Sequence, residues 1–168
     1  LLGIILKFVF FCNFKLIFTT SKQKPYSLIS QFLISRMDKV IATSKASQNF
    51  LVNESAVIRH GVDTNIYFPC KNKQALRQSL KLSSKLLIGC FGRVRPLKGT
   101  DIFVDTAIQL LKEQKNYVFI IVGRTNREFK RFKEQQLEKI LKADLTQNIL
   151  FFEEVQNSEI FKWYQSLD

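Results

Sequence analysis

Short apolar runs alternate with amphipathic segments through the first sixty residues of the chain. Three of these runs have the length of buried strands, at residues 15–20, 38–44 and 55–61. Apolar side chains recur at helical spacing over 26–37, and Ser44 is placed to cap a second helix over 45–52. The order strand, helix, strand, helix, strand is typical of a parallel sheet and predicts an α/β fold.

The same alternation resumes after residue 72. A basic, polar segment at 73–82 predicts a helix. Three continuous apolar runs predict further strands, at 85–92, 117–123 and 148–155. The remaining segments have helical periodicity, at 100–114, 126–143 and 158–167. Strands that are apolar on both faces need helices on both faces, so this block predicts a doubly wound parallel sheet.

The stretch between the two blocks contains glycine, aspartate, asparagine and proline in close order. This break predicts three parts: a first domain at 1–59, an interdomain linker at 60–72 and a second domain at 73–168. Histidine can act as a general base near neutral pH, and His60 lies in this linker. The surrounding residues favour a structural turn instead, in which Gly61 permits a sharp bend and Asp63 accepts hydrogen bonds from nearby backbone N–H groups.

The first twenty residues are strongly apolar but are interrupted by Lys7, Asn13 and Lys15. A membrane-spanning helix needs about 20 predominantly apolar residues, and the segment lacks the cleavage site of a signal peptide. We therefore expect a buried helix followed by the strand at 15–20, with a membrane-surface role as the alternative. The first residue is leucine rather than methionine, so we expect the natural start to lie elsewhere.

Composition indicates a globular protein with an anionic partner. The 168 residues are 46% hydrophobic and carry a formal net charge of +12, which suits nucleic acid, a phosphorylated metabolite or an acidic membrane surface. AT-rich coding DNA would also produce many lysines, so charge alone is weak evidence. The dispersed Cys12, Cys70 and Cys90 predict reduced packing cysteines of a cytosolic protein, and the single histidine leaves no zinc-site pattern.

The strongest chemical feature is the basic loop "GRVRPLKG" at 92–99, between a predicted strand and a predicted helix. Gly92 and Gly99 let the backbone approach a ligand, and the helix N-terminus offers unpaired N–H groups to an anion. Arg93 supplies a planar fork for two phosphate oxygens, and Lys98 supplies a compact charge. The glycine spacing fits neither a dinucleotide fingerprint nor a P-loop. The loop predicts diphosphate binding; the alternative is that its cations only decorate a solvated turn.

Four stretches, in order along the chain, resemble family 4 glycosyltransferases of the GT-B fold. They are "MDKVIATSKASQNFL", "VIRHGVDTNIYFP", "IGCFGRVRPLKGTDIFVDTAIQLL", and "YVFIIVGR" with "NILFFEEV". The third stretch contains the donor-loop pattern G-R-x-x-x-x-K-G followed by an apolar helix. Within the family, "SRMDKVIATS", "HGVD" and "GRVRPLKGTD" are most similar to the mannosyltransferases of lipopolysaccharide core assembly. The resemblance implies two Rossmann-like domains, one on the acceptor side and one that binds the nucleotide sugar.

The resemblance further implies retaining transfer from a nucleotide sugar, here GDP-mannose, to a lipid-linked or lipopolysaccharide core acceptor. It implies no metal, no separate cofactor and no nucleic-acid partner, in a cytoplasmic enzyme in peripheral contact with the inner membrane. Arg93 and Lys98 would hold the donor diphosphate, with the loop backbone at Gly92 and Gly99. Val155 would lie where the backbone faces the nucleotide base.

Some positions depart from the family pattern or have a structural explanation. Glu153 stands where the family usually has glycine. Arg95 matches no fixed family position, so we expect it to be a solvated charge. Trp163 and Tyr164, at helical spacing with Ile160, are expected to pack in the core and at an interface rather than to stack on a sugar.

Family members carry two glutamates, spaced E-x7-E, that contact the donor sugar and ribose shortly after the helix that "SEIFKWYQSLD" resembles. This pair is absent from the chain, so its catalytic residues stay unassigned, and the glycine-rich loop of the first domain is expected before Leu1. We therefore expect an internal fragment with both domains incomplete, inactive alone and poorly soluble. The alternatives are a non-catalytic remnant that folds with a partner fragment, and a basic nucleic-acid-binding module with salt-dependent binding.

Overall fold

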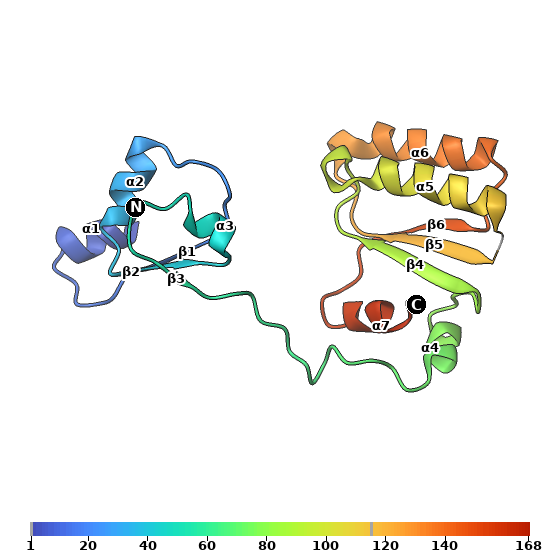
Figure 1. Ribbon diagram of the computed structural model, residues 1–168, viewed down its shortest axis with the longest axis horizontal. Coiled ribbons are helices and arrows are strands. Elements are labelled where there is room, and N and C mark those ends of the chain that lie inside the picture. Colours follow the sequence, from blue (N-terminus) through green and yellow to red (C-terminus); the bar gives the residue numbers. More distant parts are fainter. Residues whose placement is uncertain (1, 115) are drawn as a thin grey trace. The chain divides into compact units, whose positions relative to one another are not determined.

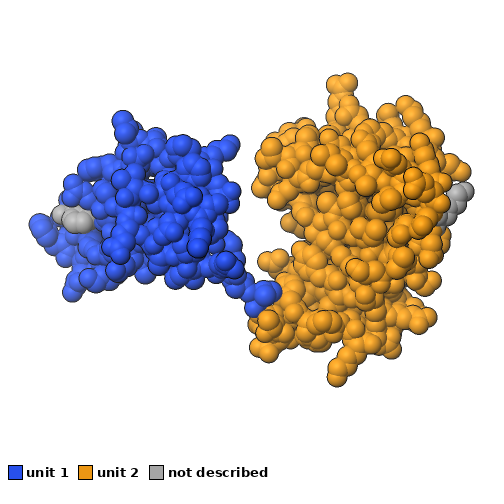
Figure 2. Space-filling view, in the orientation of Figure 1, with its two compact units in different colours: residues 1–62 blue, residues 63–168 orange. Residues whose placement is uncertain are grey.

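The computed structural model describes residues 2–114 and 116–168 and divides into two compact units, Leu1–Val62 and Asp63–Asp168 (Figures 1 and 2). Each unit contains its own three-stranded parallel sheet flanked by helices. The division between the units falls within the stretch 60–72 that breaks the sequence pattern. Each unit is therefore described by itself.

Unit 1 is built on the sheet order β1-β2-β3, whose strands are Ile17–Thr20, Lys39–Ala42 and Ala56–Val57. Its helices are α1 (Leu2–Phe8), α2 (Leu28–Ser35) and α3 (Lys45–Gln48). The predicted cap of α3 is confirmed, because the Ser44 hydroxyl accepts from the Ser47 N–H at 3.1 Å and the Ser47 hydroxyl accepts from the Ser44 N–H at 3.1 Å. This reciprocal pairing satisfies two backbone donors that would otherwise be left free at the helix start.

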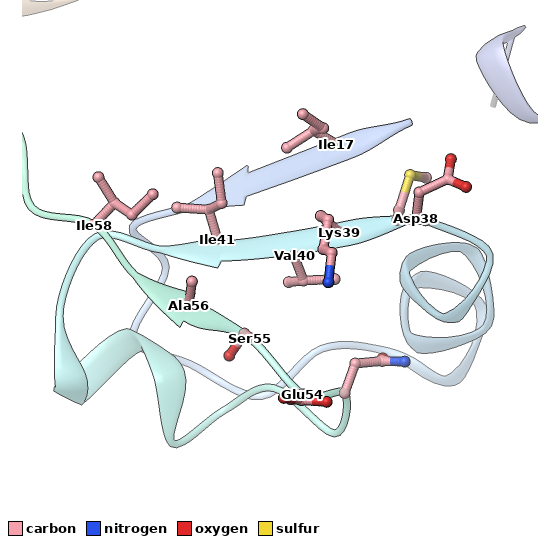
Figure 3. Close-up of a pocket in the computed structure, with 11 residues that line it drawn as sticks. Ile17, Asp38, Lys39, Val40, Ile41, Glu54, Ser55, Ala56 and Ile58 are labelled. Atoms are coloured by element: carbon pink, nitrogen blue, oxygen red, sulfur yellow. The ribbon is translucent and has the colours of Figure 1, made fainter. Parts of the chain in front are cut away.

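The sheet of unit 1 is covered unequally on its two faces. Val40 and Ala42 are buried on one side. Figure 3 shows Ile17, Ile41 and Ile58 projecting from the other side, and Ile17 and Ile58 are 60% and 56% exposed. These residues line a hollow of about 530 Å³ that runs along the uncovered face.

The helix expected in the first residues is confirmed as α1 and the following strand as β1, but the expected burial of the helix is wrong. Leu2 and Phe11 are 70% and 88% exposed, and α1 is attached to the unit by an ion pair between Lys7 and Asp38. The apolar face predicted for residues 26–37 is likewise open, since Leu28 and Ile29 on α2 are exposed. Periodicity identifies an apolar face, but burial requires a second layer, which the described residues of unit 1 do not supply.

Unit 2 is built on the sheet order β4-β5-β6, whose strands are Leu86–Phe91, Tyr117–Val122 and Ile149–Phe152. Its α-helices are α4 (Lys73–Ser79), α5 (Thr100–Glu113), α6 (Lys130–Lys142) and α7 (Ile160–Gln165). Two short 3₁₀ turns precede α5 and α6, η1 at Pro96–Lys98 and η2 at Arg127–Phe129. All strand pairs are parallel, as the alternating sequence pattern predicts.

Both faces of the unit 2 sheet are covered. Helices α5 and α6 lie on one face and α7 on the other (Figure 1). The first layer buries the apolar sides of α5, α6 and the strands, including Val104, Leu111, Phe119 and Ile140. The second layer packs Trp163 and Leu167 against Leu87, Val118 and Ile120. Residues of β5 alternate between these layers, which explains why its sequence is continuously apolar.

Two glycines let the ends of β4 and β5 approach each other closely. Gly92 and Gly123 have φ angles of +133° and +152°, a region that side chains rarely adopt. A Cβ on Gly123 would stand 2.1 Å from the Gly92 carbonyl oxygen. Any other residue at 123 would therefore force the two strand ends apart.

A polar clamp ties α4 to β4. The guanidinium of Arg77, whose side chain is 9% exposed, forms an ion pair with Asp168 and donates from Nε to the Ser166 carbonyl at 2.8 Å. The Asp168 carboxylate also accepts from the Leu87 N–H at 2.8 Å. The Asp168 N–H in turn donates to the Leu87 carbonyl at 3.1 Å. Because the charge of Arg77 is so fully paired, a buried arginine is tolerated here.

We predict that Gly123→Ala destabilises unit 2 by about 3 kcal/mol or more, since backbone strain and overlap with Gly92 add. Gly99→Ala is the matched control, because Gly99 also has positive φ, +68°, but a Cβ there meets nothing within 4 Å. It should cost only about 1 kcal/mol. Urea unfolding followed by the fluorescence of Trp163, the single tryptophan of the chain, measures both. Equal losses in the two variants would contradict the steric account.

The clamp also predicts a pH dependence. Burial acts to raise the pKa of Asp168, but the hydrogen bonds from Leu87, Arg77 and Lys73 and the charge of Arg77 outweigh it and lower the pKa below its ordinary value of 3.8. Because its pKa is lower in the folded state, the Asp168 carboxylate stabilises the fold fully at pH values above 3.8, its ordinary pKa. This stabilisation is lost as the pH falls through the pKa of the folded state. Asp168→Asn should thus lower the urea midpoint of unit 2 at about pH 7 and change it much less at about pH 3. A deficit of the same size at both pH values would show that the charge of Asp168 is not responsible.

Candidate functional site

A pocket of about 280 Å³ lies at the carboxyl ends of all three strands of unit 2. In parallel α/β sheets this is the edge where ligands bind. Each strand is followed by two residues that line the pocket: Gly92 and Arg93 after β4, Gly123 and Arg124 after β5, and, two residues beyond β6, Glu154 and Val155. Arg93, Arg124 and Glu154 are each the second residue after their strand, so the three consecutive strands contribute equivalent positions to the pocket.

Backbone hydrogen bonds hold these strand ends together. The Gly92 N–H donates to the Val122 carbonyl at 3.0 Å, and the Gly123 N–H donates to the Phe152 carbonyl at 3.1 Å. One residue further on, the Val94 N–H donates to the Arg124 carbonyl at 3.0 Å. Val94 is only 1% exposed, so it anchors the basic loop in the core. Arg93, between Gly92 and Val94, is exposed and lines the pocket.

Lys98 and Gly99 lie beside this pocket rather than in its wall. The Cδ and Cε atoms of Lys98 come within 4.0 Å of the position that a Cβ on Gly92 would occupy. Burial raises the pKa of the Cys90 thiol in β4, and the positive charge of Lys98 acts in the opposite direction. Gly99 joins η1 to α5 in the left-handed conformation, and no side chain caps the start of α5. The first N–H groups of α5 thus lack a side-chain acceptor among the described residues, although Asp101 places a carboxylate in the first turn.

The basic residues at this edge share the pocket with the carboxylate of Glu154, but form no ion pair with it in the described residues. Within the described part of the chain, no ion pair involves Arg93, Lys98 or Arg124, although six such pairs occur elsewhere. Arg77, in contrast, is fully engaged with Asp168 and backbone carbonyls. Unpaired guanidinium groups that share a pocket repel each other, so an anionic ligand would be favoured there.

The structure therefore brings Gly92, Arg93 and Val155 together in one pocket and places Lys98 against Gly92. The expectation that Arg95 is simply a solvated charge is wrong. Arg95 is half-buried, and its Nε atom is buried without a hydrogen-bond partner among the residues described. The burial follows from its position next to Val94, which fixes the loop in the core.

Sequence reasoning missed several pocket residues. Arg124, Glu154, Asn157 and Tyr164 all line the pocket. Arg124 could have been found, because it follows a predicted strand just as Arg93 does. Glu154 is the penultimate residue of the predicted strand 148–155, but its position beside the two arginines depends on the register across the sheet, which the sequence alone does not show.

Tyr164 differs in part from its expected packing role. Its ring lies 4.4 Å from the Phe91 ring and 6.2 Å from the Tyr67 ring, measured between centroids, but the residue is 45% exposed and also lines the pocket. The next residue, Gln165, donates to the Phe68 carbonyl at 2.8 Å and holds that segment in place. The predicted core packing of Trp163 is confirmed by its edge-on contact with Phe152, in which the ring centroids are 4.9 Å apart.

The linker residues lie outside this pocket. His60 is exposed and does not line it. The predicted turn at Asp63 is confirmed, because its carboxylate accepts from the Asn65 N–H at 2.9 Å. Gly61, however, does not have a positive φ, so the bend does not depend on glycine there. Among residues 2–114 and 116–168, no group of three or more histidine, cysteine, aspartate or glutamate side chains is arranged to hold a metal ion.

Two curated mannosyltransferases are similar to this chain along nearly its whole length. The chain is 38% identical over 167 residues to the lipopolysaccharide core biosynthesis mannosyltransferase LpsB of Rhizobium meliloti (strain 1021), covering 99% of this chain and 47% of that protein. It is 37% identical to the mannosyltransferase LpcC of Rhizobium leguminosarum bv. viciae, covering 98% of this chain and 46% of that protein. The chain thus spans about half the length of the curated relatives it matches.

Solved structures show the same architecture. The C-terminal domain of the group 1 glycosyl transferase LpcC from Francisella tularensis is 35% identical, with a TM-score of 0.61, and the match covers 64% of this chain and 56% of that one. Anabaena HepE, solved with UDP and glucose, is 23% identical, with a TM-score of 0.77 over 99% of this chain and 47% of that one. The second likeness establishes the fold only, and together they confirm the predicted GT-B type.

A family model provides the most direct assignment. The model described as "Glycosyl transferases group 1" matches residues 85–168, from the residue before β4 to the last residue, and this span includes every residue that lines the pocket. The chain therefore belongs to the glycosyl transferases group 1 family.

Proposed function

We propose that the protein to which this chain belongs transfers a mannosyl group from GDP-mannose to a lipopolysaccharide core acceptor. Support comes from the identity to two core mannosyltransferases along nearly the whole chain. The observation that carries the proposal is the pocket of unit 2, where Arg93 and Arg124 stand unpaired at adjacent strand ends. A sugar nucleotide supplies the diphosphate that this arrangement favours.

The same cations suit the chemistry of transfer. As the bond between the anomeric carbon and the diphosphate oxygen breaks, negative charge builds on the leaving nucleoside diphosphate. Arg93, Lys98 and the open N-terminus of α5 would stabilise that charge, and Arg124 would add to it. The acceptor hydroxyl gives its proton to the departing diphosphate oxygen as it bonds to the anomeric carbon, on the face that the leaving group vacates, so the configuration is retained. No separate cofactor takes part in this scheme.

The enzyme would work at the cytoplasmic face of the inner membrane, in peripheral contact with it. Residues 2–11 expose Leu2, Val9, Phe10 and Phe11, with Lys15 also exposed shortly after them. Apolar side chains combined with lysine suit a surface of anionic lipid. None of the described helices has the length and apolar character needed to cross a bilayer.

Binding of the donor provides the first test. Titration calorimetry of the 168-residue chain should detect GDP-mannose, and Arg93→Ala should weaken it by about 10- to 100-fold through loss of a charge-assisted contact. Lys112→Ala, on the last turn of α5, is the matched control and should leave affinity unchanged. Salt-dependent binding of DNA without binding of the sugar nucleotide would favour the nucleic-acid alternative.

Transfer provides a separate test. The family's E-x7-E glutamates are absent from these residues, so we expect the chain to bind GDP-mannose without transferring mannose to a core acceptor. The mannosyltransferase LpsB of Rhizobium meliloti serves as the positive control in the same assay. Turnover by the isolated chain would refute the expectation of inactivity while supporting the assigned reaction.

A further inference from the structure

The geometry points to Glu154 as the residue that selects guanine as the base of the donor. This inference rests on the proposed function, because it concerns the base of the nucleotide sugar bound in the same pocket. Membership of the family does not specify the base, whereas the side chain of Glu154 would set the preference for guanine.

The charges of the pocket are ordered along the edge of the sheet. Arg93 follows β4 and Arg124 follows the central strand β5, whereas Glu154 follows β6 at the outer edge. Positive charge is thus concentrated over two neighbouring strands and negative charge over the third. A diphosphate placed over β4 and β5 leaves the β6 end of the pocket for another part of the ligand.

The β6 end of the pocket is suited to an aromatic base. Val155 and Ile160 line it and pack against the core of the second layer. The aromatic pair Phe91 and Tyr164, with ring centroids 4.4 Å apart, lies instead at the β4 end of the pocket, because Phe91 is the last residue of β4. Apolar side chains such as Val155 and Ile160 can cover the face of a base and leave its polar edge to neighbouring side chains.

A carboxylate in a pocket for an anionic ligand is unfavourable unless it is paired. Glu154 has no ion-pair partner among the described residues, whereas Glu153 pairs with Lys133 at 2.8 Å and does not line the pocket. Glu153 is therefore ion-paired outside the pocket, whereas Glu154 is unpaired and lines it. Since Glu154 would repel the diphosphate, it would favour binding only by accepting hydrogen bonds from donors on the ligand.

Guanine presents the donors that a carboxylate can use best. Its N1–H and N2–H₂ groups are adjacent and can donate in parallel to the two carboxylate oxygens. Uracil has one N–H between two carbonyl oxygens, and these oxygens would repel a carboxylate. Adenine and cytosine each have an amino donor beside an acceptor nitrogen. Of these bases, only guanine offers two neighbouring donors on one edge.

The test compares GDP with UDP by titration calorimetry on the 168-residue chain. We expect the wild-type chain to bind GDP about 10- to 100-fold more tightly than UDP, the range of one good bidentate contact to a base. Glu154→Gln should remove most of this preference by weakening GDP and not UDP. Glu154→Asp, which keeps the carboxylate, should retain part of it. Glu153→Gln is the matched control and should leave the preference intact.

Each outcome bears on a different claim. Equal binding of GDP and UDP by the wild type, or an unchanged preference in Glu154→Gln, would overturn the role of Glu154 and leave the proposed transfer standing. Failure of the wild type to bind either nucleotide would overturn both. Retained UDP binding in Glu154→Gln, with an unchanged circular dichroism spectrum, shows that the variant is folded.

Discussion

The pocket of unit 2 depends on the close approach of two glycine residues. The carbonyl oxygen of Gly92 occupies the space that a side chain on Gly123 would need. Because Gly123 has no side chain, β4 and β5 can end side by side with their hydrogen bonds intact. The next residues along the chain, Arg93 and Arg124, therefore emerge into the same pocket. The position of the two charges is a consequence of this backbone contact.

Some basic residues of the chain are paired within the protein and others are not, and the net charge does not distinguish the two cases. Arg77 is buried and satisfied by Asp168 and two carbonyl groups, so it holds α4 against β4. Arg93 and Arg124 have no such partners within the described residues. A net charge of +12 would be the same in either case. What indicates an anion site is the absence of pairing at a position where a ligand can enter.

The fold could be predicted from the sequence further than the site could. Apolar runs identify strands such as 117–122 directly, because a strand between two helical layers has no polar face. Arg93 was recognisable from its loop, but the alignment of Glu154 with it arises from pairing across three strands. The exposure of Phe11 and Leu28 was not predictable, since an apolar pattern does not show whether another layer covers it.

The two units therefore differ in how completely their helices cover their sheets. In unit 2 both faces of the sheet are covered, and every residue that lines the pocket belongs to residues 63–168. In unit 1 the described residues leave one sheet face open, with Ile17 and Ile58 exposed along it. Uncovered apolar surface contributes nothing to stability and favours association. The pocket, which is formed by the fully covered sheet, should thus be separable from the behaviour of the open one.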